Sequence, residues 1–402
     1  MNLAVAKATN QSIPKFATTT TERPILILTI NNGAGHTRAA EAIAGAWSGI
    51  KHATPARVVE VSGFMSPLAR FTHVTAYLWL VKNLPSVWDR IDRFQKRRSH
   101  TSPEWFYRRE CRSLFDLARQ INPSAIIATE VGCGEIAALL KRDLNLDIPL
   151  IAVNVNYDAD RAWLQPETDF YCLANESLIK TFESNGAKSE QLAAWGVPMQ
   201  PEFFEPDDRA RKEARLNISK HFDLDEKKPM IVVAGGGEGM GKIEEIVSHL
   251  LETVKNHDAH IVVLTGHNEK LRKRCETVVR SGDPANRVRV IGWTNLVPEI
   301  FRAADVLISK LGNTFDEAIV CGLPIVALLP PPGSERVQYE LLERWGTGRA
   351  VRTVREAVLT VENLLCDSGE LSRMRVNASF FRQTNAAGKL ADWLCEKLEV
   401  KR

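Results

Sequence analysis

The sequence predicts an α/β protein made of two doubly wound domains, each with a parallel sheet. Short, wholly apolar strand signals alternate with helical runs along most of the chain, and glycine-bearing turns follow several of these strands. This alternation is typical of parallel sheets that are covered by helices. A chain of 402 residues also exceeds what one hydrophobic core usually organises. We therefore expect two domains rather than one.

Composition and charge limit the class of protein. Hydrophobic residues make up 44% and charged residues 25% of the chain, as in a soluble globular protein, and a net charge of +3 is too small to indicate nucleic acid as a partner. The seven cysteines form no CxxC pair, which favours reduced thiols and a cytoplasmic location. No apolar run approaches the ~20 residues that a membrane-spanning helix needs.

The first domain is expected over residues 24–196. Residues 1–23 are rich in Ser, Thr, Ala and Lys without a continuous apolar segment, so we expect a disordered tail and not a signal peptide. The first strand, 24–30 (PILILTI), leads into NNGAGH and then into a helix. The other strands expected are 57–61, 125–128, 148–153, 168–173 and 192–196, and helices are expected over 135–141 and 176–185.

A Pro-rich, acidic segment, 197–208, is typical of a hinge, and a second domain is expected over 209–370. Its stretch 304–338 reads as a strand, a glycine-bearing turn, a short helix, a second strand and a Pro/Gly loop, which is a parallel βαβ unit. Residues 371–402 contain an amphipathic helix that we expect to cross back to the first domain. The further strands expected are 230–234, 260–265 and 288–291, with a helix over 296–303.

Polar residues and glycines gather at the ends of the predicted strands, where open α/β sheets bind ligands. The helix that follows the turn at Gly312 offers N–H groups that favour an anion such as phosphate. Asp316 and Glu317 are predicted in the first turn of this helix. A carboxylate there can accept hydrogen bonds from both hydroxyls of a ribose. The alternative is that both acids only favour the helix dipole.

His36 is predicted at the start of the first helix, after NNGAG. An imidazole titrates near neutral pH and can act as a general base toward a hydroxyl. The alternative is a histidine that only caps the helix or makes local hydrogen bonds.

The run GGGEGMGK (235–242) satisfies GxxxxGK, the phosphate loop of nucleotide hydrolases. Ile243 stands where that loop needs a hydroxyl on Mg²⁺, and no strand ends in a clear metal-binding Asp. We therefore expect a flexible glycine loop that wraps a phosphate, with an ATPase that binds Mg-ATP at Lys242 as the lesser alternative.

Residues 64–112 combine aromatic side chains with basic ones. Trp and Tyr favour the lipid headgroup zone, and basic clusters are drawn to anionic lipid at about 1 kcal/mol per charge. Two interpretations remain open: a surface that contacts an anionic membrane, or a pair of amphipathic helices packed on the sheet with a solvated basic face. The aromatic residues include Phe71, Trp79, Phe94 and Trp105, and the basic ones include Arg97, Arg98, Arg108 and Arg109.

Taken together, these motifs resemble the monogalactosyldiacylglycerol synthase and processive diacylglycerol glucosyltransferase family, whose C-terminal domain type is shared with the peptidoglycan N-acetylglucosaminyltransferase. The resemblance covers nearly all of residues 24–393. In the first half it rests on G-x-GH (33–36), Trp163 and the turn at 196–198. In the second half it rests on GGGEGMG (235–241), the series Lys310, Gly312, Thr314 and Glu317, GLPI at 322–325, and a PG-x-E loop with a downstream amide at Pro332, Gly333, Glu335 and Gln338.

The resemblance implies a GT-B fold, in which two Rossmann-like domains face each other across a cleft. It implies an inverting transfer of a hexose from a UDP-sugar to a hydroxyl of a lipid-like acceptor such as diacylglycerol, without a metal or other cofactor. The implied partners are the UDP-sugar and the lipid acceptor. The aromatic and basic residues of 64–112 add an anionic membrane surface as a possible partner, at which the protein would be peripheral on the inner face.

The resemblance also implies a role for individual residues. The first domain would supply His36 as the general base and, on the acceptor side, Gly33, Gly35, Asn156 and Trp163. The second domain would hold the donor. Its implied contacts are Gly235, Gly236, Gly237, Glu238, Gly239, Met240 and Gly241 at the pyrophosphate, the main chain of Gly292 and Trp293 at the uracil, Gly312, Asn313 and Thr314 at the phosphates, Glu317 at the ribose, and Gly333, Ser334, Glu335 and Gln338 at the hexose or ribose.

The sequence departs from the family on the acceptor side. The acidic residue before the first glycine loop is Asn31, and in the TDF-x-x-H-x-x-W motif the Asp is Asn156 and the His is Asp160. Glu130 and Asp160, with Asp158, are therefore alternatives for the base, and the acceptor is either diacylglycerol, another lipid or a small hydroxylated molecule. Two other functions fit the same fold: a UDP-sugar 2-epimerase, and a nucleotide-sugar-binding protein without activity.

Overall fold

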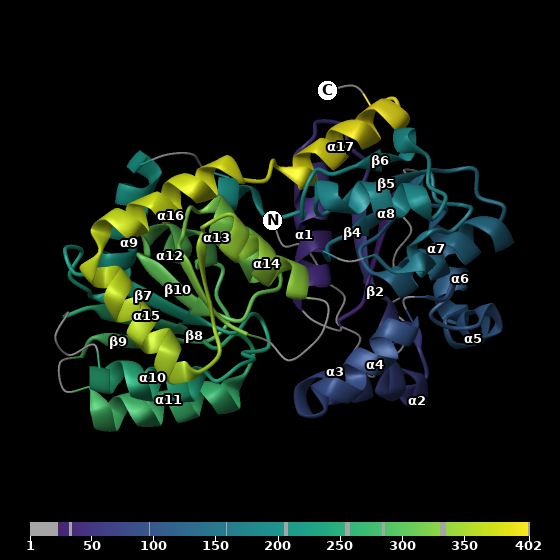
Figure 1. Ribbon diagram of the computed structural model, residues 1–402. Coiled ribbons are helices and arrows are strands. Elements are labelled where there is room, and N and C mark those ends of the chain that lie inside the picture. Colours follow the sequence, from purple (N-terminus) through teal and green to yellow (C-terminus); the bar gives the residue numbers. More distant parts are fainter. Residues whose placement is uncertain are drawn as a thin grey trace. The chain divides into compact units, whose positions relative to one another are not determined.

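The computed structural model of the chain describes residues 23–31, 34–95, 97–157, 159–204, 208–253, 258–283, 286–329 and 335–400. The chain divides into two compact units (Figure 1): unit 1 is Met1–Gln200 with Asn385–Arg402, and unit 2 is Pro201–Thr384. Among the described residues each unit contains one six-stranded sheet. The predicted class, α/β with two doubly wound domains, is confirmed. Residues 1–22 of the predicted tail and 205–207 of the predicted hinge lie outside the described residues.

Unit 1 is built on a sheet whose described strands follow the order β2-β1-β3-β4-β5-β6, with every neighbouring pair parallel. The order reverses at β1, because β2 lies on one side of it and the later strands lie on the other. Ligands of open α/β sheets bind at such a reversal point, beyond the carboxyl ends of the strands. The strands are β1 (Ile25–Thr29), β2 (Ala56–Glu60), β3 (Ala125–Ala128), β4 (Leu150–Asn154), β5 (Phe170–Leu173) and β6 (Leu192–Ala193).

Helices pack on both faces of this sheet through apolar side chains. Leu28 and Ile126, from β1 and β3, belong to a buried cluster that also contains side chains of α6 and α7. The last helix of the chain, α17, packs on α1 within the same unit. The helices are α1 (Ala34–Ser48), α6 (Arg112–Ile121), α7 (Val131–Asp143), α8 (Ile179–Ser184) and α17 (Ala386–Lys397).

Helix α7 begins earlier than the sequence predicted. Gly132 and Gly134 precede the expected start at residue 135, but both are helical because Glu130 caps the helix: its carboxylate accepts a hydrogen bond from the N–H of Cys133 at 3.1 Å. The indole ring of Trp163 packs over Gly134, where a Cβ atom would lie 3.7 Å from it. The start of α7 therefore presents a carboxylate at the carboxyl end of β3.

Between β2 and α6 the chain forms a helical arm, residues 67–110, that carries most of the aromatic and basic residues noted above. Its described helices are several and short, where the packed-helix interpretation expected a pair. His73, in a π-helix, stacks on Phe106 with ring centroids 4.8 Å apart, which joins the two ends of the arm. The arm comprises α2 (Pro67–Arg70), the π-helix Phe71–Thr75, α3 (Ala76–Asn83), α4 (Pro85–Gln95) and α5 (Glu104–Glu110).

Unit 2 has a second parallel sheet, with its described strands in the order β12-β11-β10-β7-β8-β9. Its order reverses between β10 and β7, which lie side by side with Ser309 opposite Ala234. A second ligand-binding edge is therefore expected at the ends of these two strands. The strands are β7 (Met230–Ala234), β8 (His260–Leu264), β9 (Val288–Ile291), β10 (Val306–Ser309), β11 (Ile325–Leu328) and β12 (Gly348–Val351).

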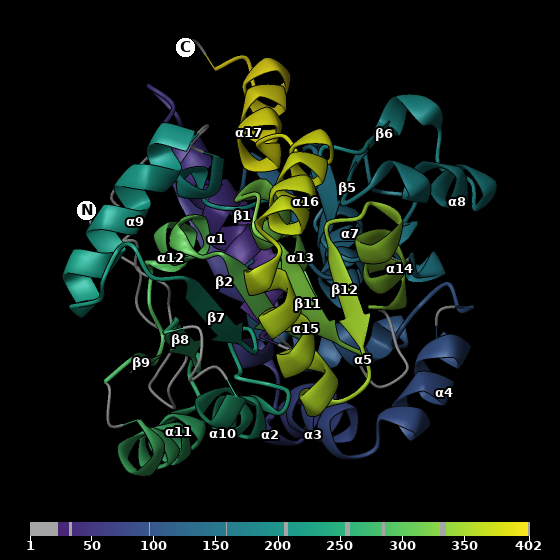
Figure 2. The same ribbon diagram turned by 60° about the vertical axis from the view of Figure 1, so that its left-hand side comes forward.

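The helices of unit 2 cover both faces of its sheet. Apolar side chains of α10, α11 and α15 pack with one face in a single buried cluster, and Figure 2 shows α15 crossing β11 and β12. Strand β12 was not predicted, nor were five of the helices: α9, α10, α11, α14 and α15. The helices are α9 (Asp208–Phe222), α10 (Ile243–Thr253), α11 (Glu269–Gly282), α12 (Val297–Ala303), α13 (Asn313–Val320), α14 (Arg336–Arg344), α15 (Val354–Cys366) and α16 (Ser368–Phe380).

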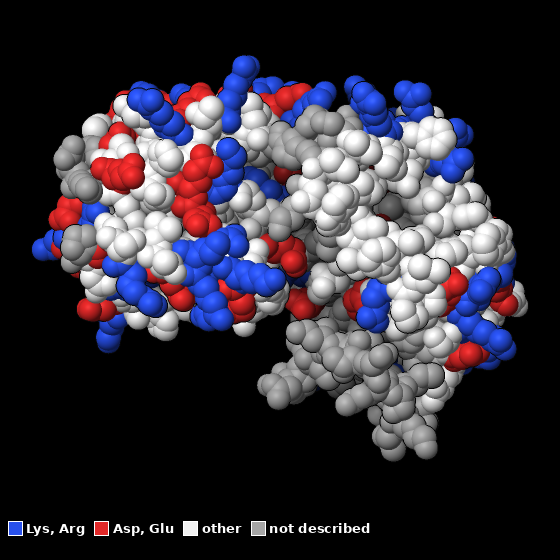
Figure 3. Space-filling view, turned by 90° about the horizontal axis from the view of Figure 1, so that it is seen from below, with Lys and Arg blue, Asp and Glu red and all other residues white. Residues whose placement is uncertain are grey.

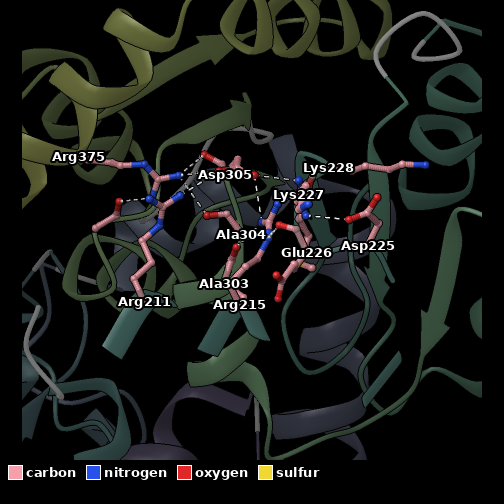
Figure 4. Close-up of polar contacts among 12 residues, drawn as sticks. Arg211, Arg215, Asp225, Glu226, Lys227, Lys228, Ala303, Ala304, Asp305 and Arg375 are labelled. Atoms are coloured by element: carbon pink, nitrogen blue, oxygen red, sulfur yellow. Dashed lines mark hydrogen bonds and ion pairs between the residues drawn. The ribbon is translucent and has the colours of Figure 1, made fainter. Parts of the chain in front are cut away.

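Asp305 joins several elements at the amino ends of β7 and β10 (Figure 4). Its carboxylate lies 2.9 Å from Arg211 and 3.1 Å from Arg215, both of α9, and 3.3 Å from Arg375 of α16. It also accepts a hydrogen bond from the N–H of Met230 at 2.8 Å. This cluster is at the edge of the sheet opposite the expected ligand site, so we assign it to the stability of unit 2.

The amphipathic helix expected near the C-terminus is two helices. α16 ends at Phe380 and belongs to unit 2, whereas α17 starts at Ala386 and belongs to unit 1. Asn385 begins the second helix, because its side chain accepts a hydrogen bond from the N–H of Gly388 at 2.9 Å. Within the described part of the chain, every helix is too short or too polar to cross a bilayer.

Candidate active-site residues of the two units

The glycine loop after β7 is held by hydrogen bonds to itself and to the end of β8. The N–H of Met240 donates to the carbonyl oxygen of Gly235 at 2.8 Å, and the N–H of His267 donates to that of Gly237 at the same distance. Glycine is required at Gly239, which has a φ of 58° and where a Cβ atom would lie 2.5 Å from the Thr265 carbonyl oxygen. The loop leads into α10 and thus places main-chain groups at the β7 side of the reversal point.

The surroundings of Lys242, which completed the GxxxxGK pattern, do not favour phosphate binding by its side chain. Its side chain is 63% exposed and lies 3.4 Å from Glu245. Together with Gly241 it lines one end of a groove of about 420 Å³ between α10 and α11. The groove runs along the helices rather than across the strand ends, so it gives no support to an ATP site.

The turn between β10 and α13 gathers several of the predicted donor residues. Gly312 has a φ of 86° and caps α13, which starts at Asn313 and Thr314. The side-chain amide of Gln338 donates to the Gly312 carbonyl oxygen at 3.0 Å. Glu335 reaches the same turn, since its Oε1 lies 3.3 Å from where a Cβ of Gly312 would be.

One cation lies within this group. The ammonium nitrogen of Lys310 is 2.7 Å from Oε1 of Glu335, and the two side chains are only 22% and 24% exposed. Lys310 directly follows β10. Gly333 and Ser334, which were predicted beside these residues, lie outside the described residues.

The adjacent acids of α13 have different surroundings. Asp316 is buried and accepts a hydrogen bond from the amide of Gln383, whereas Glu317 is only half-buried. Glu317 lies just beyond the first turn, in which the sequence had placed it. Its greater exposure makes it the better candidate for a ribose contact.

The ends of β8 and β9 present an aromatic pair that the sequence did not predict. The imidazole of His267 stacks on the indole of Trp293, with ring centroids 3.9 Å apart and an angle of 14° between the planes. Both rings are exposed, and Gly292 precedes the indole. Trp293 was predicted to act through its main chain, but its ring offers a flat surface as well. Gly266 and His267 directly follow the strand predicted over 260–265, and this was the only indication of the pair in the sequence.

In unit 1, His36 lies at the reversal point of the sheet, in the first turn of α1 together with Gly35. Its Nδ1 is 2.6 Å from the carbonyl oxygen of Thr129, which directly follows β3. A carbonyl oxygen only accepts, so Nδ1 carries the hydrogen and the lone pair of the neutral ring is at Nε2. Burial lowers the pKa of His36, and the Thr129 contact only partly opposes this. Gly33 lies outside the described residues.

Glu130 follows Thr129 and lies on the β3 side of the same reversal point. Burial of its carboxyl group raises the pKa of Glu130 to about 7, and the nearby charge of Glu135 adds to this. Hydrogen bonds from the start of α7 oppose the rise. A carboxyl group with such a pKa can exchange a proton near neutral pH.

Glu135 is a second buried carboxyl group, and nothing in the sequence pattern singled it out. It accepts hydrogen bonds from the Thr101 N–H at 2.8 Å and the Tyr107 hydroxyl at 2.9 Å, and lies 3.3 Å from Nδ1 of His100. Burial raises the pKa of Glu135 to about 7, and the charge of Asp160 is a smaller contribution. These hydrogen bonds connect the end of the helical arm to Glu135 of α7.

The remaining acceptor-side candidates follow β4. The N–H of Asn156 donates to the side chain of Asn154 at 2.8 Å, and Asp160 precedes the short helix that contains Trp163. Trp163 is 2% exposed, so its ring acts by packing on α7. Asp158 lies outside the described residues.

The helical arm exposes large apolar side chains. Trp79, Phe94 and Trp105 are each more than half exposed. The guanidinium of Arg98 lies over the Phe94 ring, 4.8 Å from its centroid. On the face shown in Figure 3, most of the described residues of the unit that carries the arm (right) are uncharged, whereas acidic and basic residues alternate over the other unit.

The sequence is similar to a known protein family and to several characterised proteins. Residues 36–199 match the family model described as monogalactosyldiacylglycerol (MGDG) synthase. The chain is 23% identical over 384 residues to a processive diacylglycerol beta-glucosyltransferase of Bacillus licheniformis, covering 94% of this chain and 96% of that protein. It is 25% identical over 391 residues to the protein of the same name from Bacillus thuringiensis, with 94% of each covered.

Solved structures share the fold. Anabaena HepE in complex with UDP has a TM-score of 0.54 at 14% identity, covering 93% of this chain and all of that one. Acinetobacter baumannii MurG has a TM-score of 0.56 at 14% identity, with 93% and 99% covered. The UDP-GlcNAc 2-epimerase of Neisseria meningitidis has 0.56 at 13%, with 94% and 100% covered. The predicted GT-B fold class is confirmed, and one fold serves both transferases and epimerases.

Proposed function

Because the chain matches the monogalactosyldiacylglycerol synthase family model over residues 36–199 and is similar along most of its length to processive diacylglycerol glucosyltransferases, we propose that it transfers a hexose from a UDP-sugar to a hydroxyl of diacylglycerol or a related lipid. One observation carries the proposal beyond these similarities. Each unit places suitable chemistry at the reversal point of its own sheet, main-chain amides and a cation in unit 2 and an oriented imidazole in unit 1.

Unit 2 is suited to hold the donor. The glycine loop and the start of α13 lie on the two sides of the reversal point, and their N–H groups favour phosphate oxygens. Glu317 would accept the ribose hydroxyls, and the His267–Trp293 pair would contact the uracil. These groups can stabilise the charge that grows on UDP without a metal, so we propose that none is required.

Unit 1 is suited to activate the acceptor. His36 would accept the proton of the acceptor hydroxyl at Nε2 as the oxygen attacks C1 of the hexose. The bond from C1 to the phosphate oxygen breaks with its electron pair on UDP, and attack from the opposite side inverts the anomeric centre. Glu130 is the alternative base, because its pKa of about 7 also permits proton transfer near neutral pH.

The helical arm gives the proposed lipid acceptor a route to the protein. Its exposed Trp79, Phe94 and Trp105 would enter the headgroup zone of a bilayer, and Arg97 and Arg98 would attract anionic lipid. We propose that the protein is peripheral, on the cytoplasmic face of a membrane, where cysteine thiols stay reduced.

A 2-epimerase is the second candidate, because an enzyme of that kind shares the fold. The two are separated by incubating the protein with a panel of UDP-sugars, with and without a total lipid extract, and analysing products by mass spectrometry. A transferase forms a lipid with one added hexose and releases UDP only when lipid is present. A changed UDP-sugar without lipid would identify an epimerase, and binding without any product would indicate a sensor.

A further inference from the structure

We propose that Tyr107 is a positioning residue for the lipid acceptor: its hydroxyl holds the returning end of the helical arm beside Glu130, at the carboxyl end of β3. The inference rests on the proposed function and adds a role for a side chain that has none in it. It begins from a contrast within α5, where Trp105 is 63% exposed and Tyr107 is 3% exposed. Helix α5 therefore reaches from the surface of unit 1 into its interior.

The buried end of α5 is fixed to α7 by hydrogen bonds. The Tyr107 hydroxyl donates to Oε2 of Glu135 at 2.9 Å and lies 2.8 Å from the hydroxyl oxygen of Thr101. Both the hydroxyl and the N–H of Thr101 donate to the same carboxyl group, the N–H at 2.8 Å. Burial raises the pKa of Tyr107, so its hydroxyl keeps the proton that it donates. Three hydrogen bonds from the arm thus meet one carboxyl group, which is 2% exposed.

The Tyr107 hydroxyl also approaches the start of α7, beside Glu130. A Cβ atom at Gly132 would lie 3.2 Å from the Tyr107 hydroxyl oxygen and 3.2 Å from Oε2 of Glu130. A side chain at Gly132 would therefore push at least one of these oxygens away. Glu130 directly follows Thr129, whose carbonyl oxygen lies 2.6 Å from Nδ1 of His36. The end of the arm is thus packed against the edge that carries both candidate bases.

Aromatic contacts connect this buried hydroxyl to the exposed part of the arm. The ring of Phe106 meets the ring of Tyr107 edge to face, with centroids 5.7 Å apart, and meets that of Trp105 in the same way at 6.2 Å. Its other contact, with His73 at 4.8 Å, joins it to the first half of the arm. Trp105 is one of the rings that would enter the headgroup zone. Tyr107 therefore fixes the membrane-facing part of the arm relative to Glu130.

Such a fixed relation matters most for an acceptor that stays in a bilayer. A lipid in the membrane can approach only where the arm meets it, so its hydroxyl reaches the base only if the arm and the end of β3 keep their positions. A short-chain acceptor in solution reaches the base by diffusion instead. Loss of the Tyr107 hydroxyl should therefore affect the two kinds of acceptor differently, whereas a purely stabilising role would affect them equally.

The test compares Tyr107→Phe with the wild type, using dioleoylglycerol in phosphatidylglycerol vesicles and dihexanoylglycerol in solution as acceptors. We expect kcat/KM for the vesicle acceptor to fall about tenfold, chiefly through KM, and kcat/KM for the soluble acceptor to change less than about twofold. Vesicle flotation and the UDP dissociation constant should stay within about twofold of the wild type. Thr101→Val removes a second hydroxyl from Glu135 and should give the same split. It replaces Tyr107→Phe if that variant does not fold.

Tyr171→Phe is the matched control. Tyr171 of β5 is also 3% exposed, but its hydroxyl lies 3.5 Å from the carbonyl oxygen of Gln165, away from the arm. This variant should leave transfer to both acceptors unchanged. A Tyr107→Phe protein that loses transfer to both acceptors equally, keeps it to both, or loses flotation in proportion would overturn the inference and leave the proposed function intact. A wild type that transfers a hexose to neither acceptor would overturn the proposed function for diacylglycerol, and this inference with it.

Discussion

The side-chain amide of Gln383 donates a hydrogen bond to the buried carboxylate of Asp316. Asp316 belongs to α13, and Gln383 belongs to the segment that leads from α16 to α17. Phe381, in the same segment, stacks on Trp345 with ring centroids 4.4 Å apart. Of the two adjacent acids of α13, Asp316 therefore holds the end of unit 2 in place, and the more exposed Glu317 is the candidate for a ligand contact.

This division of roles predicts different outcomes for two substitutions. We expect UDP to raise the melting temperature of the wild type without Mg²⁺, and Glu317→Ala to abolish that rise while leaving the melting temperature of the free protein nearly unchanged. Asp316→Asn should lower the melting temperature of the free protein by several degrees, because it weakens a buried hydrogen bond worth about 1–3 kcal/mol. Thermal unfolding with and without UDP checks both, and the reverse pattern would contradict the assignment.

His36→Ala is expected to keep the affinity for UDP but to lower transfer by about 10²–10⁴. In the wild type, burial lowers the pKa of His36, so the base is unprotonated at neutral pH. The value of kcat/KM should then be constant at and above pH 7 and should decline only below the usual histidine value of about 6.5. Transfer that persists in His36→Ala, with a pH profile that changes near 7, would identify Glu130 as the base instead.

The sequence was sufficient for features that depend on local pattern. The apolar runs predicted β1, β3, β7 and β10, and the glycine-bearing turns after β7 and β10 were also expected from the sequence. Features that depend on distant pairings were not predictable. His267 meets Trp293 only because Leu264 pairs with Ile291 in the sheet.

Two further features were not predicted from the sequence: the break between α16 and α17 and the burial of Glu135. The break between α16 and α17 contains no proline or glycine, so the apolar pattern appeared to continue through it, although Asn385 was an available capping signal. Glu135 was correctly expected to be helical. Its burial, however, depends on Thr101 and Tyr107, which come from the helical arm about 30 residues earlier in the chain.

Glu135 predicts an unusual dependence of stability on pH. Burial raises the pKa of Glu135 to about 7, so between about pH 4.5 and 7 the folded state binds more protons than the unfolded state. Its contribution to stability is therefore complete below pH 4.5 and is lost as the pH rises through 7. Denaturant unfolding at pH 5.5 and 8 should show a decrease of about 1–3 kcal/mol in the wild type.

Glu135→Gln should remove much of this decrease, because an amide does not ionise. Glu190→Gln, at an exposed position, serves as the control and should leave the pH dependence unchanged. An identical decrease in the wild type and in Glu135→Gln would show that another group, such as Glu130, is responsible.

The His267–Trp293 pair predicts a contribution to nucleotide affinity that depends on the base. His267→Ala should weaken UDP binding about tenfold, in the range found for stacking of a base on an aromatic ring. His267→Phe should bind UDP nearly as well as the wild type because it preserves the stacked pair. Calorimetry with UDP and with inorganic diphosphate separates the contributions. If His267→Ala weakens diphosphate binding equally, the loss does not come from contact with the base, because the variant keeps the main-chain hydrogen bond from residue 267 to Gly237.

The helical arm predicts membrane binding that depends on both charge and exposed aromatic rings. Replacing Arg97 and Arg98 by Glu should reduce flotation with phosphatidylglycerol vesicles at least tenfold, since each basic residue near an anionic surface contributes about 1 kcal/mol. Replacing Trp79 and Phe94 by Ala should reduce flotation with anionic and neutral vesicles alike, because both side chains are more than half exposed and would bury apolar area in the headgroup zone.

Arg108 is the matched control for these arginines. Its guanidinium lies 2.7 Å from Asp143 and 3.0 Å from Glu104, so it is already engaged in ion pairs within unit 1. Arg108→Gln should therefore leave vesicle flotation within about twofold of the wild type, although nothing in the sequence pattern distinguished Arg108 from Arg97 and Arg98. Flotation that falls as much with Arg108→Gln as with the double substitution would mean that net charge, and not this surface of the arm, attracts the membrane.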